Sequence, residues 1–316
     1  MEWSIRRYRK EDAGIWNDFA ANARNSTFLF NRGYMDYHSD RFHDCSWMAY
    51  KGNTLMAILP ANIDEDMILH SHQGLTYGGW ILPPAHLDGA DLLEIFSQAV
   101  DVWREEGIKR LDYKPLPYIY SARPSEEDIY ALFRLGAHIS EINLSAAINL
   151  REPVVYNKLR RRSLKKASSL PFIIEEMSDA GEFMSLVAAC LRERHDTAPV
   201  HTAAEISLLM SRFPDNIKLY GLRLGGNLEA AVMVYDTGRV AHAQYIASTP
   251  TGRRDNLLTP LFDYLIRECY AEREYFDFGI SNEDHGRYIN EGLLRQKYSY
   301  GATGVAYQRF ELDLQH

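Results

Sequence analysis

The composition of this 316-residue chain is that of a globular protein: 46% of the residues are hydrophobic and 25% are charged, which excludes an intrinsically disordered protein. The length favours two domains of about 150 residues each, and we expect them at 1–150 and 151–316. The formal net charge of −8 provides no general attraction to nucleic acid, so any recognition of phosphate must be local.

We expect neither a signal peptide nor a membrane span from this sequence. Its first residues, Met1-Glu-Trp-Ser-Ile-Arg-Arg, are polar, and no later window holds about 18 consecutive apolar residues. Cys45, Cys190 and Cys269 are widely separated, and the close pair His70 and His72 has no neighbouring cysteine, so neither disulfides nor a metal site are favoured. We expect a cytoplasmic protein with no integral membrane segment, no metal and no DNA partner.

The first half of the chain alternates between strand and helix patterns. In order, we expect a strand at 3–8, helices at 13–23 and 34–42, strands near Ser46 and Leu55, a helix at 90–107, a strand at 109–113, a helix at 125–135 and a strand at 143–150.

The second half follows a basic run at 157–167 and has a similar order of elements. We expect helices at 179–195 and 203–213, strands at 217–224, 228–235 and 240–248, a helix at 257–270, a strand at 275–280, a short helix carrying Arg295 and Lys297, and a closing strand. Three strands joined by short turns form an antiparallel meander, whereas the helix at 257–270 is a crossover that makes the next strand parallel. The predicted fold is therefore α/β with a mixed sheet.

Three segments of the first half recur in the same order in the second, which indicates an internal duplication. Lys51-Gly-Asn-Thr-Leu-Met-Ala resembles Gly225-Gly-Asn-Leu-Glu-Ala-Ala, and Ile108-Lys-Arg-Leu-Asp-Tyr resembles Arg273-Glu-Tyr-Phe-Asp-Phe. Leu135-Gly-Ala-His likewise matches Tyr300-Gly-Ala-Thr.

This order of elements resembles the GNAT acyltransferase fold, and two copies in one chain resemble the Fem family of peptidyltransferases and their acyltransferase relatives. The segments that carry the resemblance are Phe276-Asp277-Phe278-Gly279, then Gly292-Leu-Leu-Arg-Gln-Lys297 with Gly301-Ala302, and the basic run before the second copy. The resemblance implies two tandem GNAT domains and acyl transfer.

The acyl donor is the first question that the resemblance raises. GNAT enzymes hold the pyrophosphate of acyl-CoA at the amino terminus of the crossover helix, where N–H groups and the helix dipole favour an anion. The equivalent residues here, Gly252, Arg253, Arg254 and Asn256, contain a single glycine and break the usual glycine spacing. They either bind the phosphates of acyl-CoA or form a tight turn with solvated arginines. A Fem-type enzyme would instead take its acyl group from aminoacyl-tRNA.

Three residues near the end of the chain are candidate catalytic groups. Lys297 matches a lysine of Fem-like chains, and its ammonium would stabilise the oxyanion formed in aminolysis or only complement the helix dipole. Asp277 would act as a base or accept hydrogen bonds from the loop that follows it. His285 lies in that loop and is suited to proton transfer near neutral pH.

Candidate substrate-binding residues come from three places. Asn290 belongs to the same polar loop as His285. Arg160 and Arg161 are part of the basic run, which would bind phosphates of a nucleotide sugar, a lipid-linked sugar or tRNA, or form a solvated helix. The third place is a glycine-rich run of the first half, which contains His72, Tyr77 and Trp80. These side chains would line an acceptor pocket or pack in the interior.

Three functions follow from these residues. The first is a GNAT-type N-acyltransferase of cell-envelope biogenesis that moves an acyl group from acyl-CoA to an amine on a sugar or envelope precursor. The second is a Fem-type aminoacyltransferase that uses aminoacyl-tRNA, and the third is a GNAT pair that binds a metabolite or protein without chemistry. No Ser/His/Asp or Cys/His nucleophile pattern is present, so direct attack of the amine on the acyl donor is expected.

Overall fold

The computed structural model of the chain describes residues 2–195 and 197–315 and divides into two compact units. Unit 1 comprises Met1–Asn143 and Ala306–His316, and unit 2 comprises Leu144–Val305. The division differs from the predicted boundary at 150/151, because the end of the chain returns to the first unit. Two long strands, β8 (His138–Asn149) and β16 (Thr303–Asp313), each run from one unit into the other.

Unit 1 contains two groups of strands. One is the antiparallel sheet β1-β3-β4, and the other has the order β2-β5-β6-β7-β16, in which only β6 and β7 are parallel. The bounds of these strands are β1 Trp3–Arg7, β2 His43–Asp44, β3 Trp47–Lys51, β4 Thr54–Leu59, β5 Asn62–Ile63, β6 Ile68–His70 and β7 Arg110–Tyr113.

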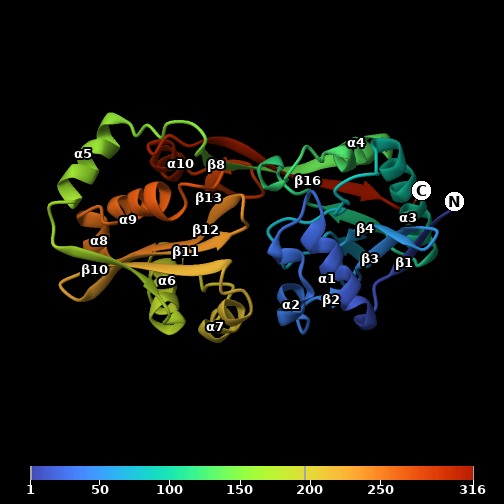
Figure 1. Ribbon diagram of the computed structural model, residues 1–316, viewed down its shortest axis with the longest axis horizontal. Coiled ribbons are helices and arrows are strands. Elements are labelled where there is room, and N and C mark those ends of the chain that lie inside the picture. Colours follow the sequence, from blue (N-terminus) through green and yellow to red (C-terminus); the bar gives the residue numbers. More distant parts are fainter. Residues whose placement is uncertain (1, 196, 316) are drawn as a thin grey trace. The chain divides into compact units, whose positions relative to one another are not determined.

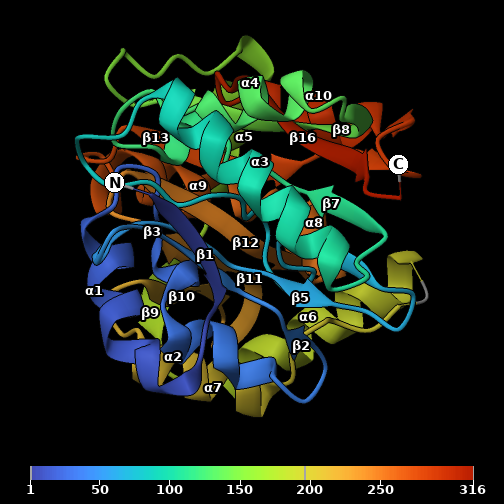
Figure 2. The same ribbon diagram turned by 90° about the vertical axis from the view of Figure 1, so that its right-hand side faces the viewer.

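The helices of unit 1 are mostly short, apart from α3. They are η1 Lys10–Asp12, α1 Ala13–Asn22, η2 Phe28–Phe30, α2 Arg32–Met35, η3 Asp36–His38, α3 Gly89–Glu105, η4 Tyr118–Tyr120 and α4 Glu127–Arg134. Asp88 begins α3 by accepting hydrogen bonds from the N–H groups of Ala90 and Asp91. Buried side chains of α3 recur every three or four residues from Leu92 to Trp103, so one face of the helix joins the core. Figure 2 shows α3 crossing over the strands of this unit.

Unit 2 is built on one sheet of order β8-β13-β12-β11-β10-β9. Its strands are β9 Phe172–Met177, β10 Ile217–Leu224, β11 Asn227–Asp236, β12 Val240–Ser248 and β13 Tyr275–Ile280, with β8 at the end. All neighbours are antiparallel except β12 and β13, as expected for strands joined by a crossover helix. A separate hairpin, β14 (Asn282–Glu283) and β15 (Tyr288–Ile289), follows β13.

Helices cover both faces of the unit 2 sheet (Figure 1). They are α5 Lys158–Ala167, α6 Ala180–His195, α7 Ala203–Arg212, α8 Pro250–Arg254, α9 Leu258–Tyr264 with its π-helical continuation η5 Leu265–Cys269, and α10 Glu291–Tyr298. The two helices α6 and α7 lie on one face, and α9, with α5 beside it, lies on the other. Thr202 begins α7 through a capping box with Glu205.

The element order predicted from the sequence is confirmed, with local differences. The helix expected at 34–42 is reduced to α2 and the single turn η3, and the helix expected at 257–270 is preceded by the separate α8. Strands β2, β5, β6 and β9 and the hairpin β14–β15 were not predicted, since they are short or lack clear alternation. None of the helices in the described part of the chain combines the length and hydrophobicity needed to span a bilayer.

Gly78 is a position where the backbone approach itself excludes a side chain. Its N–H donates to the carbonyl of Lys114 at 2.7 Å, and a Cβ atom there would lie 1.7 Å from the carbonyl oxygen of Ser71. We expect Gly78→Ala to lower the free energy of unfolding by about 3 kcal/mol, because backbone must move to admit the methyl group. Urea denaturation would measure this loss.

Gly14 provides the matched control for this substitution. It is exposed in α1, and no described residue other than its chain neighbours and the backbone of its own helix comes within 4 Å of a Cβ atom built on it. Gly14→Ala should therefore stabilise the chain by about 0.5–1 kcal/mol through helix propensity. Equal effects of the two substitutions would contradict the close approach at Gly78.

Candidate functional site

The parallel strands β12 and β13 pair over only three residues. The pairs are Val240 with Tyr275, Ala241 with Phe276, and His242 with Asp277, although β12 continues to Ser248. Beyond Asp277 the ladder between β13 and β8 shifts register, and Gly279 adopts a φ of +76°. Bulges of this kind re-aim strands next to functional sites. Residues 243–247 of β12, which we call the open edge, thus have no strand partner on the β13 side within the described residues.

Asp277 is a fully buried carboxylate at the point where this pairing ends. Its Oδ1 accepts hydrogen bonds from Ser145 Oγ at 2.6 Å and from the Gly279 N–H at 3.0 Å. His242 Nδ1 lies 2.9 Å from Oδ2. An ionised carboxylate only accepts, so His242 carries a proton on Nδ1 and has Nε2 as its second ring nitrogen. The site therefore places a histidine of fixed tautomer at the base of the open edge.

Lys297, on α10, is buried, and its side chain reaches the backbone at the end of β13. Its Nζ donates to the carbonyl of Gly279 at 2.8 Å and to that of Ile280 at 2.6 Å. Burial lowers the pKa of Lys297 to about 8, and the nearby Asp277 carboxylate limits the shift. An ammonium has three N–H donors, and the described residues offer it no third acceptor. One donor is thus available to a ligand.

Two polar atoms near this point have no hydrogen-bond partner among the described residues. They are Gln244 Oε1, on the open edge, and Ser281 Oγ, immediately after β13. Ser281 is buried, whereas Gln244, Tyr245 and Ile246 are half-buried. Buried polar atoms are normally paired, so unpaired ones flanking a strand edge are suited to a polar ligand.

The start of the crossover helix, where a pyrophosphate was expected, is already occupied by side chains. Thr249 Oγ1 accepts from the Gly252 N–H at 3.0 Å and itself donates to the buried Glu229 carboxylate. A Cβ atom on Gly252 would lie 2.1 Å from the carbonyl of Glu229, so this glycine serves close packing of helix and strand. The Thr249 hydroxyl thus links the first turn of α8 to the Glu229 carboxylate.

The arginines of this helix are also engaged. Arg253 forms hydrogen bonds to Glu193 at 2.5 and 2.8 Å and to the Ser248 carbonyl, while Arg254 pairs with its neighbour Asp255. Asn256 has a φ of +58° and lies in the turn between α8 and α9. As arranged here, Gly252, Arg253, Arg254 and Asn256 form a capped turn, and a diphosphate would have to displace Glu229 from it.

Two of the predicted substrate-binding residues, Asn290 and Arg160, form hydrogen bonds that hold neighbouring elements in place. Asn290 caps α10 by accepting a hydrogen bond from the Leu293 N–H. Arg160, on α5, donates hydrogen bonds to Ser299 Oγ and Thr259 Oγ1. Its guanidinium also lies 4.1 Å from the ring centre of Tyr300. Arg161 is exposed on α5. His285 is exposed in the turn of the β14–β15 hairpin, with a φ of +49°.

The glycine-rich run of unit 1 is buried. Trp80 packs on Phe96 in the core, and the Tyr77 ring lies 4.7 Å from that of Tyr120. His72 has a φ of +97° and stacks on His38 at 5.3 Å, and burial lowers its pKa well below the usual value. These contacts make His72, Tyr77 and Trp80 interior residues of unit 1.

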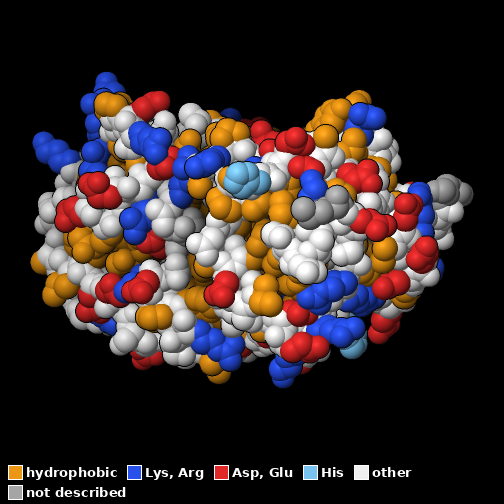
Figure 3. Space-filling view, turned by 45° about the vertical axis from the view of Figure 1, so that its right-hand side comes forward, with side chains coloured by type: hydrophobic (Ala, Val, Ile, Leu, Met, Phe, Trp, Pro, Cys, Tyr) orange, Lys and Arg blue, Asp and Glu red, His pale blue; other side chains and the backbone are white. Residues whose placement is uncertain are grey.

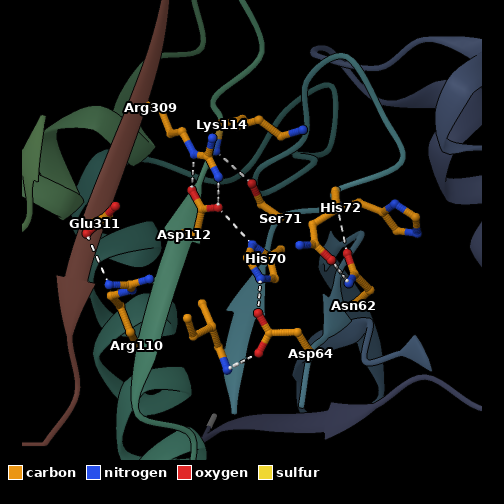
Figure 4. Close-up of polar contacts among 12 residues, drawn as sticks. Asn62, Asp64, His70, Ser71, His72, Arg110, Asp112, Lys114, Arg309 and Glu311 are labelled. Atoms are coloured by element: carbon orange, nitrogen blue, oxygen red, sulfur yellow. Dashed lines mark hydrogen bonds and ion pairs between the residues drawn. The ribbon is translucent and has the colours of Figure 1, made fainter. Parts of the chain in front are cut away.

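Unit 1 repeats the His–Asp pair of unit 2 with different partners (Figure 4). His70 on β6 is opposite Asp112 on β7, with Nδ1 and Oδ2 2.7 Å apart, but His70 Nε2 also binds Asp64 at 2.8 Å. Asp112 is further held by Arg309 through two hydrogen bonds, of which Nε to Oδ1 is 2.6 Å. The His–Asp pair of unit 1 is thus enclosed by the Asp64 carboxylate on the histidine side and the Arg309 guanidinium on the aspartate side.

The chain after His70 also occupies the position that is open in unit 2. The Ser71 N–H donates to the Asp112 carbonyl, the Lys114 N–H donates to Ser71 Oγ, and Gly78 bridges to Pro115. The run 71–80 therefore lies along the continuation of β7, and unit 1 has no counterpart of the open edge at this place.

His242, Ser145 and Glu229 were not singled out from the sequence. The repeated motifs around Asp112 and Asp277 held a usable signal, since each aspartate faces a histidine on the preceding parallel strand. Ser145 comes from β8 and Glu229 from β11, so only the pairing of distant strands brings them to the site.

Comparison with known proteins agrees with this geometry. Residues 156–287 match the sequence model of the acetyltransferase (GNAT) domain. The chain superposes on FemX with a TM-score of 0.69 at 10% identity, over 99% of this chain and 97% of that one. The chain has the tandem GNAT fold. A tandem GNAT protein from the clavulanic acid biosynthesis pathway gives a TM-score of 0.56 at 14% identity, over 100% and 99% of the two chains.

A third similar structure is L-PGS from Bacillus licheniformis, with a TM-score of 0.56 at 10% identity over 83% of this chain and 82% of that one. No curated protein sequence matches the chain. The tandem GNAT architecture predicted from the sequence is confirmed, and the GNAT domain supports a transferase enzyme. No cluster of His, Cys, Asp and Glu able to hold a metal occurs in the described residues.

The closed His–Asp pair of unit 1 predicts a structural role for Asp112. Burial opposes its ionisation, but hydrogen bonds from Arg309 and His70 hold the pKa of Asp112 well below its usual range. Removing the carboxylate takes from Arg309 its two short hydrogen bonds and leaves the longer one to Glu141 at 3.4 Å, so Asp112→Asn should lower the free energy of unfolding by about 3–5 kcal/mol. Chemical denaturation at neutral pH would measure this change.

The pH dependence checks the same assignment. A carboxylate with a lowered folded-state pKa contributes stability above its unfolded value of about 4, and that contribution is lost as pH falls below it. The wild type should therefore lose this stability in acid, and Asp112→Asn should lack that part of the loss. Asp101→Asn, at an exposed position of α3, is the control. A similar cost at both positions would contradict the closed pair.

Proposed function

We propose that unit 2 transfers an acyl group from an activated donor to an amine, with the acyl carbonyl placed between the open edge of β12 and Lys297. The observation that carries this proposal is the end of the β12–β13 ladder at His242 and Asp277, next to a buried ammonium with a spare donor and two unpaired polar atoms. An extended donor arm would add to the open edge through backbone hydrogen bonds, as peptides add to exposed strand edges.

Lys297 supplies the electrostatic part of the reaction. Two of its donors are fixed on the carbonyls of Gly279 and Ile280, so the direction of the ammonium is set before the substrate binds. The third donor would stabilise the oxyanion that forms when the amine attacks the acyl carbon. No covalent enzyme intermediate is needed, because positioning of the two substrates supplies much of the rate.

His242 is the group suited to take the proton of the attacking amine. Asp277 holds Nδ1 of His242, so Nε2 is the basic nitrogen of the ring. In the transfer from a thioester, the C–N bond forms, the C–S bond breaks, the amine proton passes to His242, and the thiolate leaves and is then protonated. Asp277 acts through His242 and is a positioning residue.

For the donor we propose acyl-CoA, and for the acceptor an amine on a sugar or cell-envelope precursor. The match of residues 156–287 to the GNAT domain supports the donor, because this domain contains the strand, turn and helix that receive CoA in GNAT enzymes. The Fem-like resemblance supports the acceptor class. His285 and Asn290, on the loop beyond β13, lie on the acceptor side of this proposal.

A second donor is favoured by one specific observation. Glu229 and Thr249 already fill the start of α8, and a carboxylate there repels a diphosphate. An aminoacyl ester of tRNA, the donor implied by the Fem-like resemblance, does not require that anion site. The two donors are therefore separated by the role of Glu229.

Replacing Lys297 tests the catalytic assignment. Lys297→Met removes the oxyanion donor and should lower kcat by about 100-fold or more, with little change in KM. The wild-type rate should fall as pH rises through about 8, where Lys297 loses its proton, and the variant should lack that limb.

Arg295→Met is the matched control, since Arg295 is exposed on the same helix and forms its ion pair with the exposed Glu291. Its rate and pH profile should match the wild type. A Lys297→Met enzyme with unchanged kcat would remove the ammonium from the mechanism.

A thermal-shift titration with acetyl-CoA tests the donor, with ATP as the control ligand. A ligand at 100 times its Kd stabilises by about 2.7 kcal/mol, which raises Tm by about 2–4 °C. We expect this shift with acetyl-CoA and a tighter Kd in Glu229→Gln, because the repelling charge is gone while the hydrogen bond to Thr249 is kept. Absence of a shift in both proteins would favour the tRNA donor.

A further inference from the structure

Helix α5 carries the main concentration of positive charge on this acidic chain. Lys158, Arg161, Arg162, Lys165 and Lys166 are all exposed, and none of them forms an ion pair with another described residue. Other exposed arginines, such as Arg7, Arg151 and Arg295, form ion pairs with acidic side chains. Basic and acidic side chains are mixed over the face shown in Figure 3. The uncompensated charge on α5 is therefore available to an external anion.

The position of α5 is fixed by its inner face. Asn157 caps the helix by accepting from the Arg160 N–H, and the Asn157 N–H donates to the Ser299 carbonyl. Arg160 adds hydrogen bonds to Ser299 and Thr259, and Leu164 and Ala167 join the core of unit 2. Because this face of α5 is fixed against unit 2, the cations at positions 158, 162 and 165 form one stripe on the solvent-exposed face of the helix.

Exposed apolar side chains accompany these cations. Val155 and Leu159 have relative exposures of 69% and 70%, and Leu159 lies within the basic helix itself. The backbone of Val155 packs so closely on Gly301 that a Cβ atom there would lie 2.9 Å from the Val155 carbonyl oxygen. The apolar pair is therefore presented from a firmly held segment.

We propose that α5 docks unit 2 on an anionic lipid surface. Cations on an amphipathic helix bind acidic headgroups, and apolar side chains beside them enter the boundary between headgroups and acyl chains. RNA would be attracted by the same charges, but its backbone offers no apolar medium to the exposed Val155 and Leu159, so lipid is the better match. Docking of this kind is independent of the acyl transfer proposed above.

Vesicle flotation with the full chain tests this proposal. The protein should float with vesicles of phosphatidylcholine and phosphatidylserine, stay unbound with phosphatidylcholine alone, and be released as NaCl rises. Each cation near the surface contributes about fivefold to partitioning, so Lys158→Glu/Arg162→Glu/Lys165→Glu should bind at least about 100-fold more weakly. Val155→Ser/Leu159→Ser should lose about tenfold at the same net charge.

A variant with the same change of net charge elsewhere separates local docking from general attraction. Lys10→Glu/Lys109→Glu/Arg192→Glu alters three exposed cations outside α5 and should float like the wild type. Equal loss in both triple variants, binding to neutral vesicles, or wild-type binding in Val155→Ser/Leu159→Ser would overturn the proposal. So would tight binding of tRNA together with no flotation. Far-ultraviolet circular dichroism confirms that each variant is folded.

Discussion

The buried carboxylate of Asp277 is the constraint on which the proposed site depends. A buried charge is tolerated only when it is well hydrogen-bonded, and Asp277 meets this condition with Ser145, the Gly279 N–H and His242. The hydrogen bond from the Gly279 N–H to Asp277 forms where the chain turns away from β12. After this turn, the carbonyls of Gly279 and Ile280 accept hydrogen bonds from Lys297. The hydrogen bonds of the Asp277 carboxylate thus fix the orientation of the His242 ring, the point where β12 and β13 stop pairing, and the direction of the Lys297 ammonium.

The two units show how one fold produces different local chemistry. Both place a histidine opposite an aspartate on a pair of parallel strands. In unit 1 the pair is completed by Arg309 and Asp64, and residues 71–80 continue along β7. In unit 2 the aspartate is held by Ser145 and the Gly279 N–H, and residues 243–247 have no strand partner on the β13 side within the described residues. The function of each unit therefore depends on the residues around its His–Asp pair and cannot be assigned from the repeated fold alone.

The sequence predicted the architecture well because its signals are local. The turns and the apolar periodicity fix the order of the elements, and the repeated motifs identified the duplication. Lys297 and Asp277 were found through the family resemblance. The remaining site residues depend on contacts between distant strands: the sequence does not reveal that Ser145 faces Asp277, or that Glu229 reaches Thr249. For the same reason, the sequence does not reveal that Arg160 and Asn290, predicted to bind substrate, form hydrogen bonds within unit 2.

The most direct test of the central claim is amide hydrogen exchange of the full chain with and without saturating acetyl-CoA. If the open edge receives the donor, exchange should slow at residues 243–247 and 278–281, because their backbone groups gain hydrogen bonds to the ligand. Slower exchange only at residues 71–80 of unit 1, or unchanged exchange at the open edge despite saturation, would contradict the account.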